Sequence, residues 1–188
     1  MEMTGEQMIP IPQQKVWEAL NDPQILKACI PGCDHIEKIS DTEYQVAMVA
    51  AVGPVKAKFS GKLVLADLNP PNSYSLSFEG SGGAAGFGKG AAQVSLAGEG
   101  SGTRLSYKVN ASVGGKLAQI GSRLIDGVAR KMADDFFAKF NQTVAPVDTE
   151  HAQAPASEAE HTGWRFPGWA WVVVALVIVT LIYLVRVP

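Results

Sequence analysis

The sequence has few of the residues from which metal sites and nucleophilic catalytic sites are built. It contains two cysteines and three histidines in 188 residues, and His151 and His161 lie in a stretch without apolar periodicity. No serine or cysteine stands in a nucleophile motif, and no metal-ligand spacing occurs. Asp134-Asp135 is more typical of a solvated helix face than of an acid–base pair. We therefore predict no enzymatic activity and no metal site. The formal net charge of −2 gives no indication of a nucleic acid partner.

The two cysteines do not form a familiar metal or redox motif. Cys29 and Cys33 are separated by three residues in C-I-P-G-C, whereas the common motifs have two intervening residues. The N-terminal residues lack the basic and apolar regions of a signal peptide, so we expect the domain to lie in the cytoplasm. In that reducing compartment two free thiols are expected, rather than a redox or metal role.

One long apolar run stands at the C-terminus. Residues from Trp169 to Val185 include no charged side chain. As a helix they span about 26 Å, close to the thickness of the hydrocarbon core of a bilayer. Trp169 and Trp171 near one end and Tyr183 near the other match the preference of aromatic rings for the two interfaces. We predict a transmembrane helix at residues 166–187.

A linker is predicted between this helix and the rest of the chain. Residues 144–165 are rich in alanine, proline, glutamate and small polar residues, and show no apolar period. Residues 1–143 then form the folded domain. The expected arrangement is a single-pass protein of the cytoplasmic membrane, anchored at its C-terminus, with the domain on the cytoplasmic side.

The domain alternates between the period of strands and the period of helices. A strand near residues 1–8 and two short helices are followed by alternating rows of apolar residues, and a helical period runs from Leu117 to about Gln142. The rows are Tyr44–Ala50, Val55–Leu63, Tyr74–Phe78, Ala92–Leu96 and Leu105–Ala111. This order predicts an α+β fold, a curved antiparallel sheet of about seven strands around a long C-terminal helix, with two short helices after strand 1.

A sheet wrapped around a helix leaves a cavity where small residues line the contact. Gly121, Gly127, Ala129 and Ala133 are such residues on the predicted helix. We expect an elongated apolar cavity that binds an apolar ligand. Its predicted lining residues are Met48, Phe59, Phe78, Phe87, Leu124, Val128 and Phe136.

A glycine-rich stretch, Gly80–Gly90, is close to a phosphate-binding loop in sequence. Gly90 stands where the serine or threonine of that motif is required, and a strand rather than a helix is predicted to follow. Nucleotide binding is therefore not expected. A flexible hairpin tip, or a mobile flap over the cavity with Phe87 as its apolar tip, remain as alternatives.

Three stretches of the sequence resemble the CoxG family of carbon monoxide dehydrogenase subunits. They are LNDPQILKACIPGCDHIEKI, GSGGAAGFGKGAAQVSL and GTRLSYKVNASVGGKLAQIGSRLIDGVARKMADDFF. The order of elements is similar to that of the START/Bet v 1-like (SRPBCC) superfamily, which has the helix-grip fold. The resemblance covers roughly residues 1–145, and some members of the family carry a C-terminal anchor.

The resemblance implies a non-enzymatic accessory protein. Its partner would be a molybdenum-containing hydroxylase, above all aerobic CO dehydrogenase, which it would recruit to the membrane. The ligand would be a quinone, menaquinone or ubiquinone, that couples the enzyme to respiratory electron transfer. Two alternatives stay open: a lipid or polyketide carrier or cyclase-like protein, with tyrosines such as Tyr44, Tyr74 and Tyr107 as its polar groups, and a ligand-free scaffold.

The two-part organisation leads to a test. A chain that ends at Ala145 is expected to be soluble and folded, because the apolar run contributes nothing to the burial of the domain core. Circular dichroism and sedimentation with membranes measure this. An unfolded domain, or one that still sediments with membranes, would contradict the division.

Overall fold

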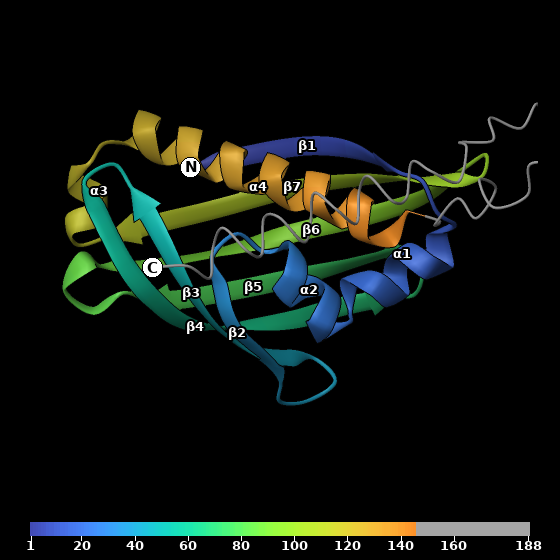
Figure 1. Ribbon diagram of the computed structural model, residues 1–188, viewed down its shortest axis with the longest axis horizontal. Helices are drawn as coiled ribbons and strands as arrows, with labels where there is room; N and C mark the ends of the chain where they lie inside the picture. The colour runs from blue at the N-terminus through green and yellow to red at the C-terminus, as the bar shows by residue number, and fades with distance from the viewer. Residues whose placement is uncertain (146–188) are drawn as a thin grey trace, which may run out of the picture. The chain divides into compact units, whose positions relative to one another are not determined.

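The computed structural model describes residues 1–145, which form one antiparallel sheet with helices on one of its faces (Figure 1). The elements in chain order are β1 (Glu2–Ile9), α1 (Gln13–Leu20), α2 (Pro23–Cys29), β2 (Cys33–Lys38), β3 (Glu43–Val52), β4 (Val55–Asn69), β5 (Ser73–Ser81), the 3₁₀ turn η1 (Gly83–Ala85), β6 (Phe87–Glu99), β7 (Gly102–Gly114), α3 (Lys116–Gln119) and α4 (Ser122–Val144).

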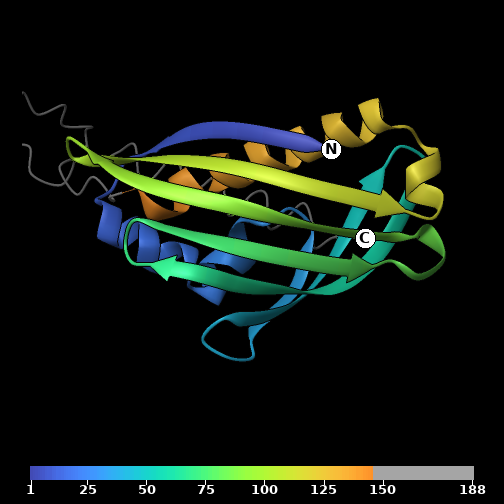
Figure 2. The same ribbon diagram turned by 180° about the vertical axis from the view of Figure 1, so that it is seen from behind.

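The seven strands follow the order β1-β7-β6-β5-β4-β3-β2. The chain leaves β1 at one edge, passes through α1 and α2 to β2 at the other edge, and returns strand by strand until β7 pairs with β1. Helix α4 lies across the concave face (Figure 1), and the view from behind shows the outer face of the sheet without a helix on it (Figure 2). This is the predicted α+β helix-grip architecture.

The two short helices begin and end where the sequence contains breakers. Pro12 precedes α1, and Asn21 ends it. The Asp22 side chain then accepts a hydrogen bond of 2.8 Å from the backbone N–H of Gln24 and caps α2, which starts at Pro23. A proline in the first turn costs no hydrogen bond, because the N–H groups there have no partner within the helix.

The C-terminal helical segment is broken, although its apolar period predicts one continuous helix. Residues Ile120 and Gly121 separate the four-residue α3 from α4. Gly121 has φ of +99°, in the left-handed region that a side chain disfavours, so the glycine sets the break. The long helix therefore starts at Ser122.

Strand β2 has no alternating row of its own in the sequence. It pairs with β3 at the sheet edge, its register shifts between Cys33 and His35, and only Ile36 among its side chains is buried. An irregular edge strand of six residues buries too little on one face to give a clear period of two.

The core lies between one end of the sheet, α1, α2 and the second half of α4. Its largest fully buried side chains include Tyr44, Phe140, Ile9 and Leu105. Phe140 is 0% exposed and stacks on Phe136 with 5.7 Å between ring centroids. The second half of α4 is thus the part of the helix that is anchored in the core.

The predicted transmembrane helix, with Trp169, Trp171 and Tyr183, lies outside the described residues, as does nearly all of the predicted linker. None of the helices within residues 1–145 is both long and apolar enough to span a bilayer.

Replacing Phe140 by alanine is expected to lower the free energy of unfolding by about 3–5 kcal/mol, because a fully buried aromatic ring leaves a cavity when it is removed. Leu124→Ala on the same helix is the matched control. Since Leu124 is 44% exposed, its loss is expected to be about 1 kcal/mol or less. Urea denaturation of both variants measures the difference. Equal losses would contradict this account of the core.

Candidate functional site

The concave face of the sheet is fully buried at one end and partly exposed at the other. Near α1 and α2, Tyr44 and Tyr74 are at most 8% exposed. Toward α3 and the β3–β4 turn, the inward side chains are only partly buried. We call this region the open end; its inward positions include Met48, Phe59, Phe78, Ala111 and Val113.

The first half of α4 lies over the open end, and its partly buried side chains are a mixture of small, polar and apolar ones: Ile125, Asp126, Val128, Ala129, Met132 and Ala133. The residues that share the face of Phe140 at three- and four-residue spacing are Asp126, Ala129 and Ala133, followed by Phe136 and Phe137. Phe137 stacks on Tyr107 of β7 with 5.5 Å between ring centroids. The phenylalanines fill the contact in the second half of the helix, whereas alanines reach less far toward the sheet in the first half.

A row of glycines crosses the sheet at the open end. Gly61, Gly80 and Gly88 are direct neighbours on β4, β5 and β6. A Cβ atom at Gly61 would overlap the carbonyl oxygen of Glu79, and one at Gly90 would lie 2.7 Å from the Phe78 ring. At Gly61 and Gly90 the neighbouring atoms therefore come closer than a side chain allows, as happens where glycine permits close approach of backbones, whereas a Cβ at Gly80 or Gly88 would make only ordinary contacts.

One polar atom in this region has no partner. Oδ1 of Asp126 is buried and makes no hydrogen bond within the described part of the chain. Asn141 also has a buried, unpaired Oδ1, but its amide nitrogen donates to the carbonyl oxygen of Met8 at 3.1 Å. Burial of a polar atom without a hydrogen bond is costly, so Asp126 requires an explanation.

The structure brings most of the predicted lining residues to the concave side. Met48, Phe59 and Phe78 are inward at the open end. Phe136 is partly buried and packs against the core. Val128 is partly buried near the start of α4, and Leu124 is more exposed and lies beside the β3–β4 turn, where a Cβ at Gly53 would be 3.0 Å from its Cδ2.

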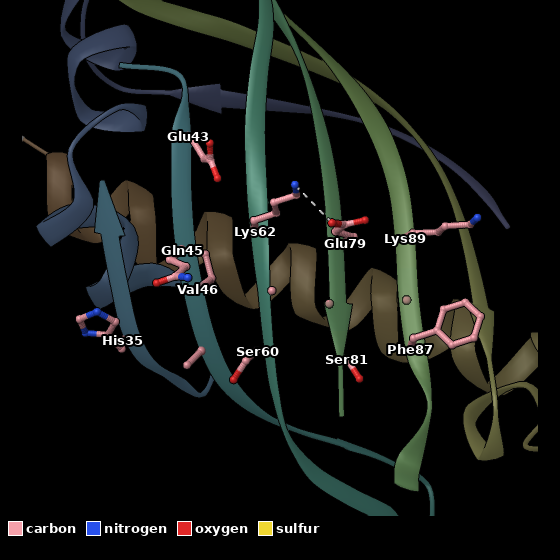
Figure 3. A pocket seen from close by; sticks show the side chains of 14 residues that line it. His35, Glu43, Gln45, Val46, Ser60, Lys62, Glu79, Ser81, Phe87 and Lys89 are labelled. Carbon is pink, nitrogen blue, oxygen red and sulfur yellow. Dashed lines mark ion pairs between the residues drawn. The ribbon is translucent and has the colours of Figure 1, made fainter. Parts of the chain in front are cut away.

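Phe87 is the exception, and its predicted inward position is wrong. It is the first residue of β6, is 48% exposed, and lines a groove on the outer face (Figure 3). The alternation of buried Ala92, Val94 and Leu96 already assigns odd-numbered residues of β6 to that face. Extending the strand back to Phe87 would have found this from the sequence.

The tip of the Gly80–Gly90 hairpin is packed rather than free. Ala85 and Gly86 are buried, and the N–H of Gly82 donates to the carbonyl oxygen of Gly86 at 2.8 Å. A Cβ at Gly86 would overlap the backbone of Gly114, so the tip lies directly against the end of β7. This close contact does not suit a mobile flap with Phe87 at its tip.

The three inward tyrosines are structural rings of the core. The Tyr44 hydroxyl donates to the carbonyl oxygen of Asn21 at 3.2 Å, and Tyr74 meets Trp17 edge to face. Burial raises the pKa of each of Tyr44, Tyr74 and Tyr107 above the usual tyrosine value. All three are therefore neutral near pH 7, which does not suit a general base.

The outer face of the sheet carries two adjoining grooves of about 670 and 830 Å³ that the sequence did not suggest. Figure 3 shows Lys62, Glu79 and Lys89 side by side there, with Lys62 and Glu79 paired at 3.5 Å. Both members of the pair are at least half exposed, so the ion pair contributes little to stability. The alternating polar residues predicted only a solvated face.

Within residues 1–145 no three histidine, cysteine, aspartate or glutamate side chains come together as metal ligands. Cys29 is buried and Cys33 partly buried, and both are free thiols. Burial raises the pKa of the Cys33 thiol, so it stays protonated near pH 7.

Solved structures of other proteins share this architecture and define it as a Bet v 1-like (SRPBCC) helix-grip fold. Ara h 8.0201 is 14% identical with a TM-score of 0.56, covering 78% of this chain and 99% of its own. A Thermus thermophilus protein is 17% identical with a TM-score of 0.54, covering 76% and 95%. A conserved protein from Geobacillus kaustophilus is 34% identical with a TM-score of 0.73, covering 77% and 95%.

Residues 5–145 match the CoxG family, which is described as a subunit of carbon monoxide dehydrogenase. The chain belongs to this family. A comparison with curated proteins finds no match.

The glycine row generates a prediction. Gly61→Ala is expected to destabilise the domain, because the added Cβ would overlap the carbonyl oxygen of Glu79 and force β4 and β5 apart. Gly127→Ala on α4 meets nothing within 4 Å and should stabilise by about 0.5–1 kcal/mol, since alanine favours helix. Thermal melts of the two variants should therefore shift in opposite directions. A neutral Gly61→Ala would contradict this account of the close approach between β4 and β5.

Proposed function

We propose that this chain is a membrane-anchored accessory protein that recruits a molybdenum-containing hydroxylase of the aerobic CO dehydrogenase type to the cytoplasmic membrane. It binds an apolar ligand, a quinone, at the open end, and so couples the enzyme to the respiratory chain. The observation that carries the proposal is the match of residues 5–145 to the CoxG family.

The family supports an accessory rather than a catalytic role. Its description associates it with CO dehydrogenase as one of the subunits of that enzyme. The inward tyrosines, which were the polar candidates for a cyclase-like enzyme, are core residues: Tyr44 is 2% and Tyr74 8% exposed. The geometry therefore favours an accessory protein over a cyclase-like one.

The open end supports a ligand of low polarity. A ring or an isoprenoid chain bound there would cover inward side chains that are mainly aliphatic or aromatic, such as Met48, Phe59 and Phe78. Burial of apolar surface contributes about 25 cal/mol per Å², so covering these side chains favours binding. A ligand-free scaffold would instead leave them partly exposed to water.

The membrane part of the proposal rests on the sequence of residues 166–187, whose length and aromatic ends suit a transmembrane helix. A domain tethered by a linker is confined near the bilayer. Its effective concentration there reaches the millimolar range without any specific contact. Quinone exchange with the bilayer and docking of the enzyme would then occur within the reach of one tether.

Ligand binding is tested by placing a charge at the open end. Val128→Glu is expected to abolish binding of a quinone, because an unpaired carboxylate in an apolar site is costly to desolvate. Ala138→Glu is the matched control, since Ala138 is exposed on the same helix. Quinone titrations and circular dichroism melts are measured on both. Unchanged quinone affinity in a folded Val128→Glu variant would count against the site.

Recruitment of the dehydrogenase is tested by membrane fractionation. With the full chain, dye-linked activity of the dehydrogenase should sediment with membranes, and with the chain that ends at Ala145 it should remain soluble. Sedimentation of the enzyme without the apolar run would contradict the anchoring role.

A further inference from the structure

Asp126 occupies an unusual place for an acidic residue. It lies on the face of α4 that also carries Ala129, Ala133 and Phe140, and its Oδ1 is buried. The other acidic residues farther along α4, Asp134 and Asp135, are exposed, and Asp135 is paired with Lys131 at 2.8 Å. Asp126 is thus the acidic side chain of α4 that is turned toward the sheet.

Nothing in the described part of the chain donates a hydrogen bond to this oxygen. A carboxylate accepts hydrogen bonds and donates none when ionised, so its natural partner is an N–H or O–H group. A buried water as that partner would need two to four polar contacts. Ala129 and Ala133 on the same face of the helix have apolar side chains, and the two arginines one turn away, Arg123 and Arg130, are exposed. The buried oxygen therefore suits a donor that arrives with a ligand.

We infer that Asp126 is the polar anchor of the open-end site and accepts a hydrogen bond from a hydroxyl of the bound ligand. Given the proposed function, on which this inference rests, the ligand recognised by Asp126 is the hydroquinone. A quinone presents only carbonyl oxygens, which accept hydrogen bonds, whereas the hydroquinone formed by adding two electrons and two protons presents two hydroxyl donors. Asp126 therefore makes the site selective for the reduced form.

The inward side chains of the open end fit this division of roles. The inward side chains Met48, Phe59 and Phe78 offer apolar contact that both redox forms can use equally. Of these four side chains, the carboxylate of Asp126 is the one that distinguishes a hydroxyl from a carbonyl. Hydrogen bonds to charged groups are among the stronger ones in proteins, and one such bond accounts for on the order of tenfold in affinity.

The experiment compares durohydroquinone and duroquinone as probes with the full chain in detergent, under anaerobic conditions. Isothermal titration calorimetry, corrected with empty micelles, gives both dissociation constants. The wild-type chain is expected to bind durohydroquinone about tenfold more tightly than duroquinone. Asp126→Asn should lose this preference, because its amide can also donate to a quinone carbonyl. Asp134→Asn, the same change on the exposed side of α4, should retain it.

The outcomes separate the two proposals. Equal binding of both probes by the wild-type chain, a preference for duroquinone, or an unchanged preference in folded Asp126→Asn would overturn the role of Asp126 while leaving quinone binding in place. Binding of neither probe by the wild-type chain would overturn the ligand-binding function together with the role of Asp126. The wild-type comparison requires no variant to fold.

Discussion

Three phenylalanine rings in α4 fasten the helix to the concave face of the sheet. Phe140 is 0% and Phe137 9% exposed, and Phe136 contacts both rings at centroid distances of 5.1 and 5.7 Å. Each buried ring contributes roughly 1.5–3 kcal/mol. Because this contact holds the helix at one end, the other end does not have to pack tightly, and the small side chains at Ala129 and Ala133 are tolerated.

The sheet, like α4, differs between its two ends. The neighbouring glycines Gly61, Gly80 and Gly88 place no side chain on the concave face, and Gly61 lies too close to β5 for a side chain to fit. At the open end, small residues therefore stand on both the helix and the sheet. The buried oxygen of Asp126 has no hydrogen-bond partner within the described residues. In the role inferred above, its partner comes from the bound ligand.

An accessory role is consistent with such a domain. Stability comes from a core that makes no use of catalytic groups, and the inward tyrosines are held by packing and by the hydrogen bond from Tyr44 to Asn21. In the proposed function, chemistry belongs to the partner enzyme. Under the same proposal, the tether would contribute proximity to the membrane, and the open end would contribute selective binding of one redox form.

Much of the fold followed from periodicity. Alternating residues such as Tyr74, Leu76 and Phe78, and the three- and four-residue spacing up to Phe140, report which side of an element is apolar, because local geometry decides where a side chain points. The same logic failed where the local signal was weak: β2 is a short edge strand, and Gly121 broke a helix whose apolar period continued across the break.

The sequence by itself determined the order of most elements, the apolar faces of those elements and the resemblance to the family. It could not distinguish the core position of Phe140 from the partly exposed position of Val128, since both belong to one apolar pattern. That difference and the unpaired oxygen of Asp126 were decided by the tertiary structure. Burial and hydrogen bonding depend on what the opposite element supplies, and here the opposite element supplies packed aromatic rings at one end and glycines at the other.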